Sequence, residues 1–292
     1  MGAFLAKTFV VLLLAAAIFG GAAYFTYELF VRPTKQLADE KLAPATPRPP
    51  DPALPEFKKA MAVLKSGDLL GARDALSRFV EQNPHSQMLD EAKEHLGNIN
   101  SDILLSPKPA PEKQVYVVKP GDVLNKVARI TKTSPDLLMR SNGLTGIMLR
   151  INQQILYTPA DFSVLINKKE GKVVVLNRGK FFKHYPIRNT FGAAAPKKGA
   201  TGPVPKQSGK VAEKIAWGPS GGRVIFTDKE YPEAKFWVSF TVAGHTLYGE
   251  PDAGTPQPAN NKPPVGGIGL APESVKELAL MLPRGCPVTI ES

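Results

Sequence analysis

Cysteine is almost absent from this chain of 292 residues, because Cys286 is its single example. One cysteine excludes an intramolecular disulfide and any zinc or iron–sulfur site built from several cysteines. The length predicts about two domains with room for linkers. A hydrophobic share of 43% and a charged share of 22% are ordinary for a globular protein, so disorder of the whole chain is excluded.

Charge is absent from residues 8–27, where almost every side chain is apolar. Twenty helical residues at about 1.5 Å each span about 30 Å, which is the thickness of one hydrocarbon core. We therefore expect a transmembrane anchor over residues 1–35, inserted once in the cytoplasmic or inner membrane. The C-terminal domains would lie on the periplasmic or other extracytoplasmic side. A cleaved signal peptide is the alternative, because residues 15–23 include many small side chains.

Proline is present in excess, with 28 residues. Seven prolines lie in residues 33–55, three in residues 107–111 and five in residues 251–264. The first two groups lack a periodic apolar pattern, which predicts extended linkers over residues 36–55 and 106–114. The third group falls inside the last domain and predicts a long loop beside its cleft.

Residues 56–105, between the two linkers, have apolar side chains at helical spacing. Gly67-Asp68 separates the first two expected helices, Asn83-Pro84 ends the second, and a third is expected over residues 86–104. The spacing resembles a tetratricopeptide repeat, and a plain helical hairpin with a docked third helix is the alternative. The positions that carry this resemblance are Ala60, Gly67, Ala72, Leu76, Phe79 and Pro84. We expect a spacer or a surface for a protein partner here, without chemistry.

Residues 115–159 predict the order strand, helix, helix, strand. Alternating apolar residues stand at both ends, and two short helical patterns lie between them. Pro120-Gly121-Asp122 predicts a turn, with Asp122 as the N-cap of the first helix. Ser134-Pro135 begins the second helix and Asn142-Gly143 ends it.

This stretch resembles the LysM module over its full length. The matching residues are Tyr116, Val118, Gly121, Asp122, Leu124, Ala128, Leu138, Asn142, Leu149, Gln154, Leu156 and Pro159. Val123 stands where the family prefers Thr, and Asn152-Gln153 where a Gly is usual. The resemblance implies binding of glycans that contain N-acetylglucosamine, such as peptidoglycan, in a shallow groove between two loops. The implied contacts are Gly121, Asp122, Val123, Leu124, Met148, Leu149 and Arg150.

Residues 160–292 are dominated by short strand patterns, with one late helix near residues 272–282. The hairpins, a His-bearing strand, a Gly-rich turn into the late helix and the sequence RGCPVTI resemble the L,D-transpeptidase catalytic domain. That family attacks a peptide carbonyl with a cysteine thiolate that a histidine activates. Its cysteine lies in a Ser-His-Gly-Cys-x-Arg sequence that enters the late helix.

The corresponding sequence here, PVGGIG, lacks the nucleophile. Where the family has Ser, His, Gly, Cys and Arg, this chain has Pro264, Val265, Gly266, Gly267 and Gly269. His245 corresponds loosely to the family's upstream histidine. We therefore expect no catalytic residue and a vestigial cleft at His245, Gly266, Gly267 and Gly269, where backbone N–H groups would bind a carboxylate or a peptide. Cys286, beyond the helix, is expected to be a small buried hydrophobe.

These patterns together predict an α+β multidomain protein. Its expected parts are an N-terminal transmembrane helix, a helical segment resembling a tetratricopeptide repeat, a βααβ LysM module and a mostly-β L,D-transpeptidase-like domain. The expected function is membrane-anchored peptidoglycan binding at the cell envelope, without catalysis, cofactor or metal. The alternative is an active L,D-transpeptidase or a related wall-modifying enzyme with a displaced active site.

The net charge of +11 lies mainly in residues 112–292. It would complement the carboxylates of peptidoglycan stem peptides and anionic wall polymers. Nucleic acid is not an expected partner, because no stacking aromatic or basic-helix motif accompanies the charge.

Overall fold

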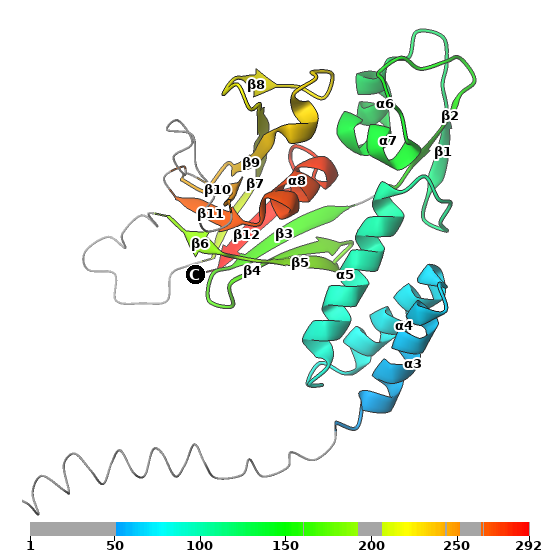
Figure 1. Cartoon of the computed structure of the whole chain (residues 1–292), viewed down its shortest axis with the longest axis vertical. Coiled ribbons are helices and arrows are strands. Elements are labelled where there is room, and N and C mark those ends of the chain that lie inside the picture. Colours follow the sequence, from blue (N-terminus) through cyan, green and yellow to red (C-terminus); the bar gives the residue numbers. More distant parts are fainter. Residues whose placement is uncertain are drawn as a thin grey trace, which may run out of the picture. The chain divides into compact units, whose positions relative to one another are not determined.

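The computed structural model describes residues 51–159, 161–191, 206–242, 244–251, 264 and 266–291. Asp51–Ser292 clusters as one compact unit. The expected anchor, most of the first linker, Val265 and most of the proline-rich loop lie outside the described residues. Figure 1 shows the helical segment, the two-helix module and the sheet of the last domain.

The predicted fold class is wrong in its N-terminal transmembrane helix. Among the described residues, no helix is both long enough and apolar enough to cross a membrane. The longest described helix has 17 residues, which amounts to about 26 Å, and it carries Asp90 and Glu91 in its first turn. Residues 1–35, where the spanning helix was expected, lie outside the described ranges. The described fold is therefore a mixed α/β arrangement.

The helical segment consists of α3 (Leu54–Lys65), α4 (Leu69–Gln82) and α5 (Leu89–Leu105). Asp68 caps α4, because its side chain accepts a hydrogen bond of 2.9 Å from the Gly71 N–H. Phe57 and Phe79 pack with their ring centroids 5.6 Å apart in a core that the three helices share.

The following module has the predicted order of elements. It consists of β1 (Gln114–Val117), α6 (Leu124–Ile130), α7 (Pro135–Asn142) and β2 (Gln154–Tyr157). The strands pair antiparallel, with Val115 opposite Leu156. Ser134 caps α7 and Gly143 ends it in the left-handed conformation. The turn residues in the sequence thus define both ends of this helix.

The last domain is a mixed sheet with one helix against it. Its strands are β3 (Phe162–Asn167), β4 (Lys172–Asn177), β5 (Lys180–Pro186), β6 (Asn189–Thr190), β7 (Gln207–Trp217), β8 (Arg223–Val224), β9 (Lys235–Phe240), β10 (Thr246–Gly249), β11 (Gly267–Leu270) and β12 (Pro287–Glu291). The main path runs β5-β4-β3-β12-β7-β9-β10-β11-β6, and β8 pairs with β7. Helix α8 (Pro272–Met281) packs on β9 and β10. A 3-10 turn, η2 (Tyr231–Glu233), precedes β9.

Both preceding segments pack against this last domain. From α5, the Asn100 side chain donates a 2.8 Å hydrogen bond to the carbonyl of Phe182 in β5. From the cap of α7, the Ser134 hydroxyl donates a 2.7 Å hydrogen bond to the carbonyl of Leu280 in α8. Leu104 and Leu137 join the hydrophobic core of the sheet. The domain limits predicted from the sequence stay a prediction, but these contacts join the three segments into one body.

Candidate functional site

The first loop of the two-helix module is held by a buried carboxylate. Gly121 has a φ of 78°, so the turn uses the left-handed region that glycine adopts freely. The Asp122 side chain is 1% exposed and pairs with Lys126 at 2.9 Å. It also accepts hydrogen bonds of 2.8 Å from the Lys119 N–H and from the Tyr116 hydroxyl. The pKa of Asp122 is lowered to about 2. The largest cause is the hydrogen bond with Lys126, followed by those with the Lys119 N–H and the Tyr116 hydroxyl.

The predicted N-cap role of Asp122 is wrong. Val123 occupies the N-cap position of α6 and makes no side-chain capping bond. Tyr116 approaches Asp122 only after β1 has folded beside the turn, and both carboxylate oxygens then have partners within the loop. Asp122 therefore shapes this loop and has little capacity left for a ligand.

The second loop is bonded directly to the end of the first strand. The Asn152 N–H donates to the Val118 carbonyl and the Val118 N–H donates to the Gln153 carbonyl, each at 2.9 Å. Asn152 has a φ of 67°, in the region where Asn is the best tolerated residue after Gly. Asn152 thus explains how the chain keeps this turn without the usual glycine, and the two predicted loops lie side by side.

The side chains between these loops differ in exposure. Val123 is 60% exposed and Met148 is 91% exposed, whereas Leu124 is 2% exposed in the core of the module. Leu149 also packs partly against that core. Ile147 and Ile151, at the two ends of the second loop, are exposed as well. We call the exposed set Val123, Ile147, Met148 and Ile151 the groove residues. Leu124 lies too deep to contact a sugar, and the contacts of the others stay a prediction.

The predicted cleft residues of the last domain are brought together. β10 and β11 run parallel with Thr246 opposite Gly267, so His245 lies beside Gly266 at the start of both strands. Gly266 has a φ of 75°, and a Cβ there would lie 1.4 Å from the Gly244 carbonyl oxygen. The Nε2 atom of His245 lies 3.0 Å from Nζ of Lys168.

Tyr248 occupies the space that a side chain at Gly267 or Gly269 would need. A Cβ at Gly267 would lie 3.0 Å from the Tyr248 ring, and a Cβ at Gly269 would lie 2.9 Å from the Tyr248 hydroxyl. The Gly267 N–H already donates a 2.8 Å hydrogen bond to the Pro264 carbonyl. That N–H is therefore unavailable to a carboxylate, in contrast to the expectation from the sequence.

Tyr248 and Glu250 leave buried polar atoms without a partner in the described part of the chain. Tyr248 is 4% exposed, and neither its hydroxyl nor Oε2 of Glu250 has a hydrogen-bond partner there. Burial, with Glu250 as a second cause, raises the pKa of Tyr248 to about 12. The phenol is thus neutral at pH 7.

Cys286 and His245 lie too far apart to form a thiolate–imidazole pair. Cys286 donates a 3.1 Å hydrogen bond to the carbonyl of Phe162, at the first residue of β3, whereas His245 contacts Lys168, just beyond its last residue. β12, which follows Cys286, and β10, which follows His245, have β7 and β9 between them, and three strand spacings amount to about 14 Å. Burial, followed by the charge of Asp161, raises the pKa of Cys286 to about 12.

Two cavities lie elsewhere in the described residues. One of about 1020 Å³ lies among α5, α7 and α8, and one of about 430 Å³ lies between the start of α5 and the β4–β5 hairpin. No local sequence pattern predicts either cavity, because their walls come from distant segments. Within the described ranges, no group of three or more His, Cys, Asp or Glu side chains is placed to hold a metal ion.

The family model of the LysM domain matches residues 116–157. Residues 116–157 form a LysM domain. The prediction of this domain from the sequence is confirmed, and the match coincides with the β1–α6–α7–β2 element order. A comparison with curated proteins gave no significant match.

Solved structures similar to this chain include several L,D-transpeptidases. That of Mycobacterium smegmatis is 15% identical over 48% of this chain and 64% of its own, with a TM-score of 0.29. That of Stackebrandtia nassauensis is 22% identical over 45% of this chain and 56% of its own, also at 0.29. L,D-transpeptidase 1 of Mycobacterium tuberculosis is 12% identical over 50% of this chain and 68% of its own, with a TM-score of 0.28. The chain thus spans less than two thirds of the first two structures.

Proposed function

We propose that this protein binds peptidoglycan through the groove residues of its LysM domain and does not catalyse acyl transfer. The observation that carries the proposal is the LysM domain itself, with exposed apolar side chains on two adjoining loops. Sugar rings have apolar faces that pack on such side chains, and polar backbone groups of the loops would bind the acetamido group. Since peptidoglycan lies outside the cytoplasmic membrane, we place the protein on the extracytoplasmic side.

The absence of acyl transfer is supported by the chemistry of the last domain. The chain has one cysteine, and its buried thiol has a pKa of about 12, so almost no thiolate forms at pH 7. The strands that follow Cys286 and His245 are separated by two other strands, which places the two residues three strand spacings, about 14 Å, apart. At the position where the resemblance to L,D-transpeptidases would place the nucleophile, Gly267 is covered by Tyr248.

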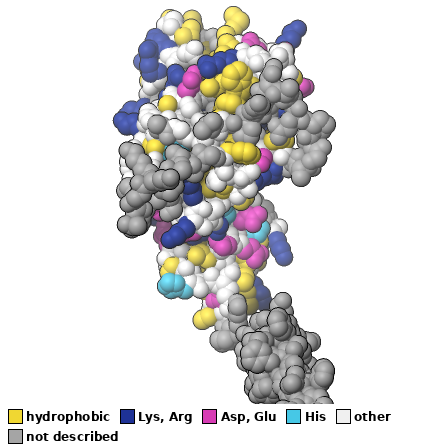
Figure 2. All heavy atoms as spheres, turned by 90° about the vertical axis from the view of Figure 1, so that its left-hand side faces the viewer, with side chains coloured by type: hydrophobic (Ala, Val, Ile, Leu, Met, Phe, Trp, Pro, Cys, Tyr) yellow, Lys and Arg dark blue, Asp and Glu magenta, His cyan; other side chains and the backbone are white. Residues whose placement is uncertain are grey.

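The basic charge supports a wall ligand rather than nucleic acid. Figure 2 shows Lys and Arg side chains in several separate groups on the face turned to the viewer. Scattered cations favour diffuse attraction to an anionic polymer over a defined nucleic-acid track. A protein partner at α3–α5 stays a prediction from the sequence.

Co-sedimentation of the purified full chain with peptidoglycan sacculi tests the binding. Met148→Asp should reduce the bound fraction at least tenfold, because a carboxylate at this exposed position prevents apolar packing on the sugar. Ile130→Asp is the matched control, since Ile130 is 51% exposed at the far end of α6. Equal binding by both variants and the unchanged protein would contradict the groove.

The same incubation tests the enzymatic alternative. We expect no new peptide cross-links and no release of D-alanine, with the unchanged chain and with Cys286→Ala alike. Cross-links that disappear in Cys286→Ala would overturn the non-catalytic proposal and favour an active transpeptidase with a displaced site. Cross-links that persist in Cys286→Ala would overturn it too and indicate another nucleophile.

A further inference from the structure

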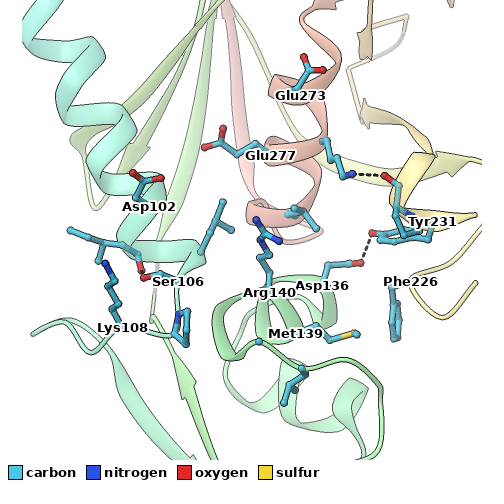
Figure 3. Close-up of a pocket in the computed structure, with 18 of the residues that line it drawn as sticks. Asp102, Ser106, Lys108, Asp136, Met139, Arg140, Phe226, Tyr231, Glu273 and Glu277 are labelled. Carbon is cyan, nitrogen blue, oxygen red and sulfur yellow. Dashed lines mark hydrogen bonds between the residues drawn. The ribbon is translucent and has the colours of Figure 1, made fainter. Parts of the chain in front are cut away.

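The larger cavity, of about 1020 Å³, has walls from three segments of the chain. Figure 3 shows side chains from the end of α5, from α7, from α8 and from the η2 turn around one space. Its size lies at the upper end of the range for small-molecule sites.

Hydrogen bonds between the segments fix the walls. Ser134 at the start of α7 donates to the carbonyl of Leu280 in α8, and the Tyr231 hydroxyl bonds the Asp136 carboxylate. From the other side, Glu277 of α8 pairs with Lys183 at 2.9 Å and accepts a bond from Ser101 of α5. The space is therefore formed before any ligand binds.

The cavity presents charges of both signs above an apolar lining. Arg140 of α7 and Lys108, after α5, provide two cations, while Asp102 of α5 and Glu273 of α8 provide two carboxylates. Among the residues that the structure describes, none of these four side chains has a hydrogen bond or an ion pair. Figure 3 shows Arg140 extending from α7 toward α8.

The apolar part of the lining comes mainly from Leu105, Met139, Leu144 and Phe226. A ligand that matches such a site carries an amine, a carboxylate and an aliphatic chain. Arg binds a carboxylate through two parallel hydrogen bonds, and a carboxylate side chain accepts from an ammonium group. A short peptide that ends in a carboxylate and carries a side-chain amine has this chemistry, whereas an unsubstituted glycan does not.

The cavity adjoins the groove through one continuous loop. Leu144 lines the cavity, and three residues later Ile147 begins the exposed second loop of the groove. Three residues reach at most about 11 Å, whereas an extended peptide of four residues spans about 14 Å. A peptide attached to a sugar in the groove is therefore long enough to enter the cavity.

We propose that this cavity binds the peptide substituent of the glycan, with Arg140 on its carboxylate, while the groove residues hold the sugar. The inference rests on the proposed function. It adds a second contact for the same polymer and gives the protein a preference for glycans that carry peptides. Two linked contacts strengthen binding beyond either alone.

Calorimetry of the full chain with three probes tests the inference. The first is a tetramer of N-acetylglucosamine, the second is a purified disaccharide–peptide fragment of digested sacculi, and the third is that fragment after an amidase has removed its peptide. We expect the unchanged protein to bind a peptide-bearing fragment about tenfold tighter than the same fragment after amidase removal of the peptide. Arg140→Gln should lose most of this difference and keep its affinity for the tetramer.

Arg129→Gln is the matched control, because Arg129 is an exposed arginine of the same domain outside the cavity lining. It should keep the tenfold difference. Equal affinity of the unchanged protein for the fragment with and without peptide would overturn the cavity proposal alone. The cavity proposal would also be overturned if Arg140→Gln kept the full difference in affinity between the fragments with and without peptide. Failure to bind the tetramer at all would contradict the groove as well, and both proposals would then fall.

Discussion

The LysM loop and the cleft of the last domain both turn at a glycine with positive φ, but the two glycines have opposite surroundings. A Cβ at Gly121 would meet nothing within 4 Å, whereas a Cβ at Gly266 would lie 1.4 Å from the Gly244 carbonyl oxygen. The first glycine leaves a loop open beside exposed apolar side chains. The second permits two backbone segments to touch. A glycine in a site motif therefore indicates a backbone requirement, and only its neighbours tell whether a ligand has room.

Adding one methyl group to each glycine gives the sharpest test of this comparison. Gly266→Ala should lower the free energy of unfolding by about 4 kcal/mol, because strain at positive φ adds to a clash between backbone atoms. Gly121→Ala carries the strain without the clash and should lose about 1 kcal/mol. Urea denaturation of both variants measures the difference. Equal losses would show that the cleft is looser than the contact between Gly244 and Gly266 indicates.

Tyr248 provides the next test, because it fills the cleft. Tyr248→Ala should lower the free energy of unfolding by about 3 kcal/mol, since it leaves a cavity over Gly267 and Gly269. Tyr248→Phe removes a buried hydroxyl without a described partner and should change stability by less than about 1 kcal/mol. A large loss of stability in Tyr248→Phe would instead reveal a ligand or water bound to that hydroxyl.

A smaller effect is expected from the carboxylate that holds the LysM loop. The folded-state pKa of Asp122, about 2, lies below its usual value of 3.8. Its stabilising contribution is therefore present above about pH 4 and is lost as the pH falls through 2. Asp122→Asn should be less stable than the unchanged chain at pH 7, and the gap should close toward pH 2. Thermal unfolding along a pH series measures this, and a gap independent of pH would contradict the proposed role.

The sequence was sufficient for the LysM domain because its signals are local. The alternation of apolar and polar residues marks the strands, and the limits of α7 are marked by Ser134-Pro135 and Asn142-Gly143. Each of these signals depends on neighbouring residues only. The N-cap expected at Asp122 failed because Tyr116, which binds that carboxylate, arrives through tertiary folding. The burial of Leu124 likewise depends on how α6 packs in the module.

The sequence was insufficient for the cleft and for the cavity, because both depend on distant segments. Tyr248 covers Gly267 through parallel pairing of β10 with β11, and no local pattern sets that register. The cavity needs α5, α7 and α8 to meet, although residues 106–114, between the first two, were expected to form an extended linker. Packing between segments thus carries the information that composition and spacing lack.

The bond from Ser134 to the carbonyl of Leu280 has a mechanical consequence. The LysM domain cannot swivel on a linker while this bond and the contact between Tyr231 and Asp136 persist. A glycan chain held in the groove would therefore orient the LysM domain and the last domain together. Tension along that glycan would act first on the contact between α7 and α8. The two domains would then move as one rigid unit and not as two domains on a flexible linker.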